Sequence, residues 1–327
     1  MSVSEAELLV ALQRGVPLAA RPFEELSRET GCTEADLLDC LARCRARGDA
    51  RRFGAVFDTR RLGYRSALCA VRVPPDAVDA AAAKLTPLTG VTHCYLREAA
   101  AGGGEQPNLW FTLSYPADVF AAMADEVSAR LRPYAVHVLP ATRRYKVDVV
   151  FGAATRAREE DVEGDLPPVT ARDRAVIAAL QGDTEARPDY FAGLAEKLGM
   201  KEWDLLSTLE LWRRNGRLKR IGLLLRHRAA GWTANGMCCW KVPGDTTAVG
   251  RALADRGEVT HCYERPEAPT FPYNLFAMIH ACSVPEAEAQ YAALRGTVAA
   301  AAGEDVPSVM LLSTREYKKT SMTFFAK

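Results

Sequence analysis

The sequence predicts an α+β protein made of two copies of one unit that fold against each other as an internal pseudo-dimer. Three observations predict this. Residues 51–74 align with residues 219–243, and the pentapeptide VTHCY occurs twice, at residues 91–95 and 259–263. In both halves, short helical patterns come before strands that alternate with helices. The chain of 327 residues is also long enough for two or three domains.

The first part of each half predicts three short helices followed by an extended segment. Ser4 precedes the first apolar pattern and Glu7 comes three residues later, as in a capping box. The segments PFEELSRETG and TEADLLDCLARCRARG follow, each ended by a glycine, and then comes RRFGAVF. This order is typical of a winged helix-turn-helix, which we place at residues 1–58 and, by the repeat, at residues 170–226.

The second part of each half predicts a small sheet. Its elements in the first half are strand SALCAVRV, helix PDAVDAAAAKL, strands VTHCYLR and NLWFTLS, helix ADVFAAMADEVSARL and strand AVHVLPATRRYK. This βαββαβ order defines a ferredoxin-like domain, expected at residues 59–151 and again at residues 227–327. Residues 152–169 are charged and contain two prolines near their end, so we expect an exposed linker.

Composition disfavours several classes of protein. The net charge is +1, with 42 Lys and Arg against 41 Asp and Glu, so no excess of positive charge favours nucleic acid. No leader pattern is visible, and no uncharged apolar run reaches the ~20 residues that a bilayer requires, so we expect a cytoplasmic protein without membrane contact. The nine cysteines contain no C-x-x-C pair, which predicts reduced thiols.

Strand alternation predicts which side chains share a sheet face, because residues two positions apart point to the same side. One face of the second half should carry Val259, His261, Tyr263, Arg265, Asn274, Phe276, Met278 and His280. The first half offers His93, Tyr95, Arg97, Asn108, Trp110 and Thr112 in the same way. Ser114 stands where the second half has His280, so the two faces are expected to differ in function.

Several of these motifs carry a resemblance to a known family. They are GAVFDTRRLGYRS, GVTHCYLRE and PNLWFTL in the first half, and RHRAAGWTANGMCCWKVP, EVTHCYERP, PYNLFAMIH and STREYKKT in the second. A winged helix-turn-helix joined to a ferredoxin-like domain resembles the Lrp/AsnC regulators, and these motifs in this order resemble the two subunit types of the siroheme decarboxylases. The resemblance covers nearly all of both halves. It implies a non-oxidative carboxy-lyase that removes two acetate carboxyl groups of siroheme to give 12,18-didecarboxysiroheme, for haem d1 or haem synthesis.

A flat macrocycle with many carboxylates needs apolar contacts on its faces and cations at its rim. Histidine transfers protons near neutral pH, so His261 is the first candidate for the catalytic proton donor and His280 the second. Either could instead ligate the substrate iron; no metal site of the protein alone and no further cofactor are expected. Candidate substrate-binding residues are His93, Tyr95, Arg97, Arg220, His227, Tyr263, Arg265, Asn274, Arg315, Lys318 and Lys319. We expect one main site in the second half, covered by the first.

Two alternatives stay open. The winged helices also fit a ligand-responsive transcriptional regulator, but the predicted recognition helix carries Glu34, Asp36 and Asp39. These carboxylates repel DNA phosphates, so DNA binding is not expected. The same face also fits a haem or siroheme carrier without turnover. The expected partners are siroheme and its decarboxylated products, with a second copy of the chain or a related decarboxylase protein as protein partner.

Overall fold

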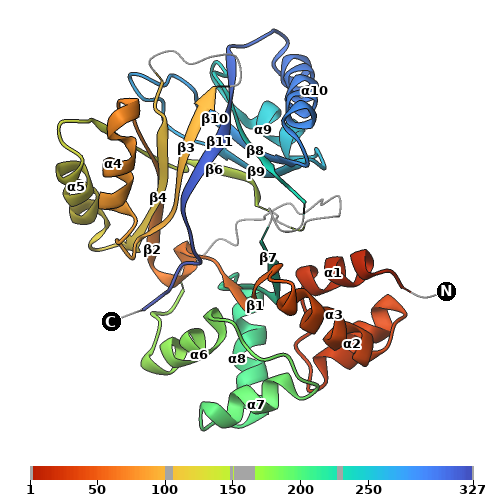
Figure 1. Ribbon diagram of the computed structural model, residues 1–327. Helices are drawn as coiled ribbons and strands as arrows, with labels where there is room; N and C mark the ends of the chain where they lie inside the picture. Colours follow the sequence, from red (N-terminus) through yellow and green to blue (C-terminus); the bar gives the residue numbers. More distant parts are fainter. Residues whose placement is uncertain (1–2, 100–105, 148–149, 151–165, 227–230, 326–327) are drawn as a thin grey trace.

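The computed structural model describes residues 3–99, 106–147, 150, 166–226 and 231–325. Figure 1 shows a helical body below and a body of strands with helices on its outer sides above. The lower body combines the winged helix units of both halves, and the upper body combines both ferredoxin-like units. The two halves are therefore interleaved. None of the described helices has the length and apolar character needed to cross a membrane.

The helices of the lower body begin and end close to the predicted positions. They are α1 (Glu5–Arg14), α2 (Pro22–Thr30), α3 (Glu34–Ala46), α6 (Ala171–Gln181), α7 (Tyr190–Lys197) and α8 (Glu202–Arg214). The capping box at the first helix is confirmed, because the Glu7 amide donates to Ser4 Oγ at 3.3 Å and the Ser4 amide donates to the Glu7 carboxylate at 2.9 Å. Phe53 of the first half packs edge to face against Tyr190 of the second at 5.6 Å, which joins the two units in one core.

The extended segments after the helices, β1 (Ala50–Phe57) and β7 (Leu218–Leu225), pair with each other antiparallel. Gly54 lies opposite Gly222 at the centre of this ribbon. A Cβ at Gly54 would lie 2.4 Å from the Gly182 carbonyl oxygen, so only glycine lets the end of α6 approach the ribbon this closely. Each half therefore supplies one strand of this two-stranded ribbon.

The upper body confirms the βαββαβ order in both halves. Its strands are β2 (Tyr64–Val71), β3 (Val91–Ala99), β4 (Leu109–Pro116), β5 (Val136–Pro140), β6 (Arg143–Val147), β8 (Ala234–Trp240), β9 (Val259–Glu264), β10 (Leu275–Ala281) and β11 (Ser308–Lys319). Its helices are α4 (Val78–Leu85), α5 (Phe120–Arg130), α9 (Thr247–Ala254) and α10 (Val284–Ala302). The strands form one hydrogen-bonded order, β5-β2-β4-β3-β11-β8-β10-β9-β6.

The predicted final strand of the first half, AVHVLPATRRYK, is in fact two strands that belong to different halves of the sheet. β5 pairs with β2 of its own half, whereas β6 pairs with β9 of the other half. Likewise, β11 pairs with β8 through its first residues and with β3 through its last ones. Each half thus contributes a strand to the other half's part of the sheet. Trp110 of the first half packs with Phe271 and Phe276 of the second half in one apolar cluster. This confirms the internal pseudo-dimer.

Candidate active site

The two VTHCY motifs lie at the ends of β3 and β9 that face the lower body. The Thr320 amide, just beyond β11, donates to the Thr92 carbonyl at 2.8 Å, and Arg144, which pairs with Tyr263, contacts Asp58 at the end of β1 at 3.1 Å. The pairing register shifts beside both histidines. In β3 the shift lies between Val91 and His93, and in β9 it lies between Val259 and His261.

These register shifts correct one predicted face. Val259 was expected beside His261, but it packs with Cys262 in the core under the helices. The β-bulge adds one residue to the strand, so Thr260 and not Val259 accompanies the histidine. On the neighbouring strand, Phe276 and Met278 lie with Trp110 and Phe271 in a cluster that is separate from the core under the helices, as alternation predicts.

A hydroxyl group links the two histidines of the second half. Thr260 Oγ1 lies 3.1 Å from Nδ1 of His261 and 3.3 Å from Nδ1 of His280. The same hydroxyl donates its proton to the Met278 carbonyl at 3.1 Å. When the hydroxyl donates to this carbonyl, it accepts from both imidazoles, and both rings then carry a proton on Nδ1.

The outer nitrogen of His280 lies beside Asn235. His280 Nε2 lies 3.5 Å from Nδ2 of Asn235, at the outer limit of a hydrogen bond, and the Asn235 carbonyl oxygen faces Arg97 of the first half at 3.4 Å. Because the oxygen faces the guanidinium, the amide nitrogen donates to His280, whose Nε2 accepts. His280 is thus held between Thr260 on one side and Asn235 on the other.

Arg97 and Arg265 occupy equivalent places in the two halves of the upper body. Each guanidinium lies over the tyrosine two residues earlier, at 5.4 Å for Tyr95 and 4.8 Å for Tyr263. Each also donates to a backbone carbonyl of the other half, that of Leu311 at 3.3 Å for Arg97 and that of Leu139 at 2.6 Å for Arg265.

Both of these guanidinium groups remain charged. Burial lowers the pKa of Arg97 to about 10 and also lowers that of Arg265, which leaves both protonated near neutral pH. Within the described part of the chain, neither forms an ion pair with a carboxylate. Two positive charges therefore lie inside the upper body without an ionic partner among these residues, an arrangement that favours an anionic ligand.

His93 lies among positive groups from several elements. Its Nδ1 is 2.9 Å from Thr92 Oγ1, and Lys319 lies directly opposite it on β11. Burial is the main cause that lowers the pKa of His93 to about 3, and the charges of Arg51 on β1 and of Lys319 act in the same direction, with smaller effects from His261 and Arg97. The imidazole is therefore neutral near pH 7.

This environment predicts a pH effect on stability. The folded pKa of about 3 lies below the ~6.5 of an unfolded imidazole, so the unfolded chain binds more protons between these values. The stability contributed at His93 is complete above about pH 6.5 and is lost as the pH falls toward 3. We expect His93→Gln to reduce the fall in Tm between about pH 7 and about pH 5. His137→Gln, which alters a histidine on β5, is the control, and an unchanged slope for His93→Gln would contradict the assignment.

The region beside His261, which corresponds by the repeat to the surroundings of His93, contains a buried carboxylate. Asp58 lies 3.1 Å from Arg144 and 3.7 Å from Lys219. Burial opposes ionisation of Asp58, but the charges of Arg144, Lys219 and Arg60 outweigh it and hold its pKa below the usual value. These cations are therefore committed to a buried carboxylate.

Beside His93, the repeat puts Arg226 at the position of Asp58 and Arg51 at that of Lys219. No described carboxylate forms an ion pair with Arg51. Arg51 thus belongs to the first half, while two of the three histidines belong to the second.

Two predicted substrate anchors point away from this site. Bulges in β11 turn Arg315 and Lys318 toward the helix side of the sheet. Arg315 forms an ion pair with Asp79 on α4 at 2.7 Å, and Lys318 Nζ donates to the carbonyls of Thr86 and Leu88 at 2.7 and 2.8 Å. Their assignment as carboxylate anchors is corrected. Regular alternation along the strand does not account for these β-bulges, which change which side chains face the interior.

Asn274 has a structural role that the sequence did not indicate. Its side-chain amide donates to the Val242 carbonyl at 2.8 Å and accepts from the Val242 amide at 2.9 Å. Asn108 makes the same pair of bonds with Val73. Both hydrogen-bonding ends of the side chain are thus occupied by backbone groups, and its assignment to substrate binding is corrected.

This role predicts a loss of stability. Asn274→Ala leaves both Val242 backbone groups without these bonds, so we expect the free energy of unfolding to fall by about 1 to 3 kcal/mol. Urea denaturation measures the change, and Asn108→Ala, the equivalent variant, should show a similar loss. Unchanged stability together with a raised KM for the tetrapyrrole would instead support substrate binding by Asn274.

The remaining predicted residues are placed as follows. Arg220 lies on β7 opposite Val56, half-buried in the ribbon of the lower body. His227 lies outside the described residues. Sequence reasoning missed Arg51 and Thr260; the repeated threonine of VTHCY was a visible signal for Thr260, whereas nothing in the sequence marked Arg51 as a neighbour of His93.

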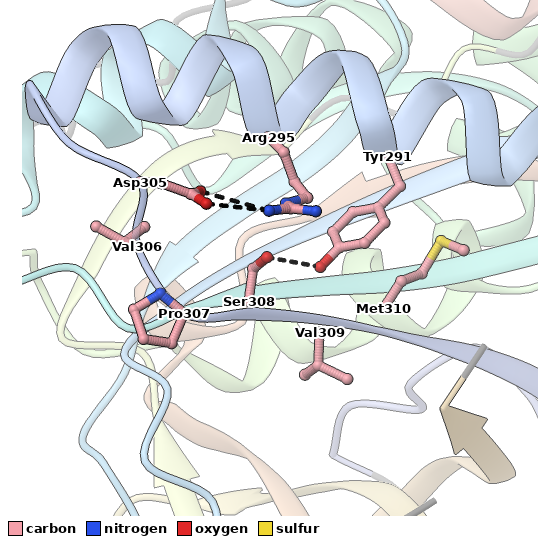
Figure 2. Close-up of a pocket in the computed structure, with 8 residues that line it drawn as sticks. All are labelled: Tyr291, Arg295, Asp305, Val306, Pro307, Ser308, Val309 and Met310. Carbon is pink, nitrogen blue, oxygen red and sulfur yellow. Dashed lines mark hydrogen bonds and ion pairs between the residues drawn. The ribbon is translucent and has the colours of Figure 1, made fainter. Parts of the chain in front are cut away.

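A cavity of about 500 Å³ lies elsewhere, between α10 and β11 (Figure 2). Its polar groups bond to one another: Tyr291 donates to Ser308 at 2.8 Å, and Arg295 pairs with Asp305 at 3.2 Å. No histidine lines it. This cavity is therefore separate from the predicted histidine site. Across the described ranges, no three His, Cys, Asp or Glu side chains are grouped as a metal site.

The repeated fold and the positively charged interior define a tandem ligand-binding protein of the AsnC type, joined to helix-turn-helix units. The family model described as "AsnC-like ligand binding domain" matches residues 61–146 and 229–318, and "Siroheme decarboxylase NirDL-like HTH domain" matches residues 5–51.

The chain belongs to the siroheme decarboxylase family, whose members are carboxy-lyases. It is 32% identical to a siroheme decarboxylase of Hydrogenobacter thermophilus over 98% of this chain and 95% of that protein. It is 34% identical to the siroheme decarboxylase NirDL subunit of Paracoccus denitrificans, over 98% of this chain and 96% of that one. The crystal structure of the siroheme decarboxylase NirDL in complex with an iron-uroporphyrin III analogue matches with a TM-score of 0.72 and 29% identity, over 99% of this chain and 95% of that one.

Proposed function

We propose that this chain decarboxylates siroheme, and that siroheme binds at the end of the upper body that faces the β1/β7 ribbon. The observation that carries the proposal is the pair of buried guanidinium groups, Arg97 and Arg265, each four residues after a repeated histidine. A macrocycle with several carboxylates supplies the negative charge that this interior favours. The relatives named siroheme decarboxylase, and the bound iron-uroporphyrin III analogue of one of them, support the same substrate class.

Each group has a distinct part in the proposed reaction. Peripheral carboxylates are bound by Arg51, Arg97, Arg265 and Lys319. Phe276 and Met278 contact the macrocycle. The bond between the acetate carbon and its carboxyl group breaks, carbon dioxide leaves, and the electron pair stays on the side-chain carbon. His261, in its protonated form, delivers the proton that completes a methyl group.

This scheme also specifies the product and the cofactor requirement. Two acetate side chains react in turn, which gives 12,18-didecarboxysiroheme. Breaking this bond transfers no electron to or from the protein, so the reaction needs no cofactor besides the iron that the substrate already carries. A second copy of the chain or a related decarboxylase protein is the expected protein partner, and duplex DNA is not.

The test is anaerobic incubation of the purified protein with siroheme, followed by mass spectrometry of the tetrapyrrole. We expect the successive loss of one and then two molecules of carbon dioxide. An unchanged mass together with a shifted Soret band would show a carrier without turnover. Tight binding of duplex DNA at low salt, without decarboxylation, would instead favour a regulator.

A further inference from the structure

The last described residues of the chain form a strap, defined as residues 319–325, between the upper and lower bodies. Figure 1 shows the dark-blue end of the chain leaving β11 and passing to the side of the lower body. The strap begins with Lys319, opposite His93, and the next residue, Thr320, bonds to the Thr92 carbonyl through its amide at 2.8 Å. Thr92 in turn contacts His93 through its hydroxyl. The strap is therefore attached directly to the motif that carries the histidine.

The far end of the strap is anchored in the lower body. The Phe324 ring is buried, 5.2 Å from the Tyr64 ring and 6.2 Å from the Phe57 ring, both edge to face. Its amide donates to the Gln181 side chain at 2.7 Å, and the Gln181 amide donates back to the Phe324 carbonyl at 3.2 Å. The strap is thus held at both ends, which fixes the residues between them.

Ser321 lies in the middle of the strap and contacts two arginines of β1. Its Oγ accepts from Arg51 Nη2 at 2.5 Å and from Arg52 Nε at 3.0 Å. Arg51 is the cation whose charge acts most strongly on His93. Ser321 therefore sets the position of a charge that is available to a carboxylated ligand.

Among the residues that the structure describes, the surroundings of the two histidine motifs differ. β6 is the counterpart of the last part of β11, and there Val147 lies opposite His261 where Lys319 lies opposite His93. Lys219, the counterpart of Arg51, lies 3.7 Å from the buried carboxylate of Asp58.

We propose that the strap is part of the substrate site, in which Ser321 is a positioning residue that directs the Arg51 guanidinium, beside Lys319, toward one peripheral carboxylate of the tetrapyrrole. The inference rests on the proposed function and adds a residue with a defined role. Because Ser321 acts on binding through Arg51 and does not touch the reacting carbon, it should affect affinity and KM more than kcat.

The test uses the full chain and four variants: Ser321→Ala, Ser321→Thr, Arg51→Ala and Ser321→Ala combined with Arg51→Ala. Iron uroporphyrin III is the probe, titrated by its Soret absorbance, and siroheme decarboxylation is followed in parallel. We expect Ser321→Ala to weaken binding and raise KM by roughly 3- to 10-fold, with kcat within about twofold. Ser321→Thr keeps the hydroxyl and should restore wild-type values.

The double variant separates positioning from a general effect on folding. If Ser321 acts through Arg51, Ser321→Ala should cause no further loss once Arg51 is alanine. Thr323→Ala, at an exposed position of the same strap, is the matched control and should bind like the wild type.

Three outcomes would overturn the inference: wild-type affinity of Ser321→Ala, equal loss in Thr323→Ala, or additive losses in the double variant. Failure of the wild-type chain to bind the probe and to decarboxylate siroheme would overturn the proposed function as well. The two failures are therefore distinguishable.

Discussion

The His261→Gln variant is expected to bind the tetrapyrrole but to lose nearly all decarboxylation. General acid catalysis typically contributes ~100-fold to ~10,000-fold, so we expect kcat to fall within that range while Kd for iron uroporphyrin III changes little. Glutamine keeps a side-chain donor for Thr260 but does not supply a proton near neutral pH. Single-turnover decarboxylation and a Soret titration measure the two quantities separately.

His280→Gln is the informative comparison, because His280 reaches the same Thr260 hydroxyl while its outer nitrogen accepts from Asn235. We expect a smaller loss of kcat than for His261→Gln, since this imidazole positions its neighbour. If His280→Gln caused the larger loss, the two roles would have to be exchanged. Equal and complete losses in His93→Gln and His261→Gln would argue that both motifs supply protons.

The Arg97→Met variant is expected to lose substrate affinity without losing stability. A buried charge without an ionic partner carries a desolvation cost that no ion pair offsets, so an apolar side chain of similar size should leave the free energy of unfolding unchanged or raise it. The lost bonds to Leu311 and Asn235 offset part of that gain. Removing one member of a buried ligand ion pair costs ~2 to 5 kcal/mol, so Kd should rise roughly 30-fold to several thousand-fold.

Urea denaturation and a Soret titration on the same protein test both parts of this expectation. Arg143→Met is the matched control, because Arg143 is a surface arginine whose guanidinium pairs with Asp245 at 2.8 Å. Its affinity for the tetrapyrrole should equal that of the wild type. A strongly destabilised Arg97→Met with normal affinity would show that Arg97 serves the fold and not the ligand.

Local patterns in the chain were sufficient for much of the architecture. The capping box at Ser4, the order of helices and strands, and the repeat itself depend on neighbours within a few residues or on direct comparison of the halves. The pairing of His261 with His280 on one face was also predictable, because alternation is regular along β10.

The tertiary structure decided what the repeated residues do. Bulges turned Arg315 and Lys318 away from the site and placed Thr260 beside the histidines, because one extra residue reverses the faces that alternation predicts. The exchange of β6 and β11 between the halves likewise depends on pairing across more than 100 residues of chain.

By itself, the sequence determined that two similar units carry the same histidine motif and that the second ends with one histidine more. Only the folded chain decided how they differ. Beside His261, the nearby cations are committed to the buried Asp58, whereas beside His93 the strap holds Arg51 through a neutral hydroxyl. The physical reason is that the electrostatic environment of a charged side chain depends on the residues around it in the fold. Arg51 and the strap that holds it come from opposite ends of the sequence.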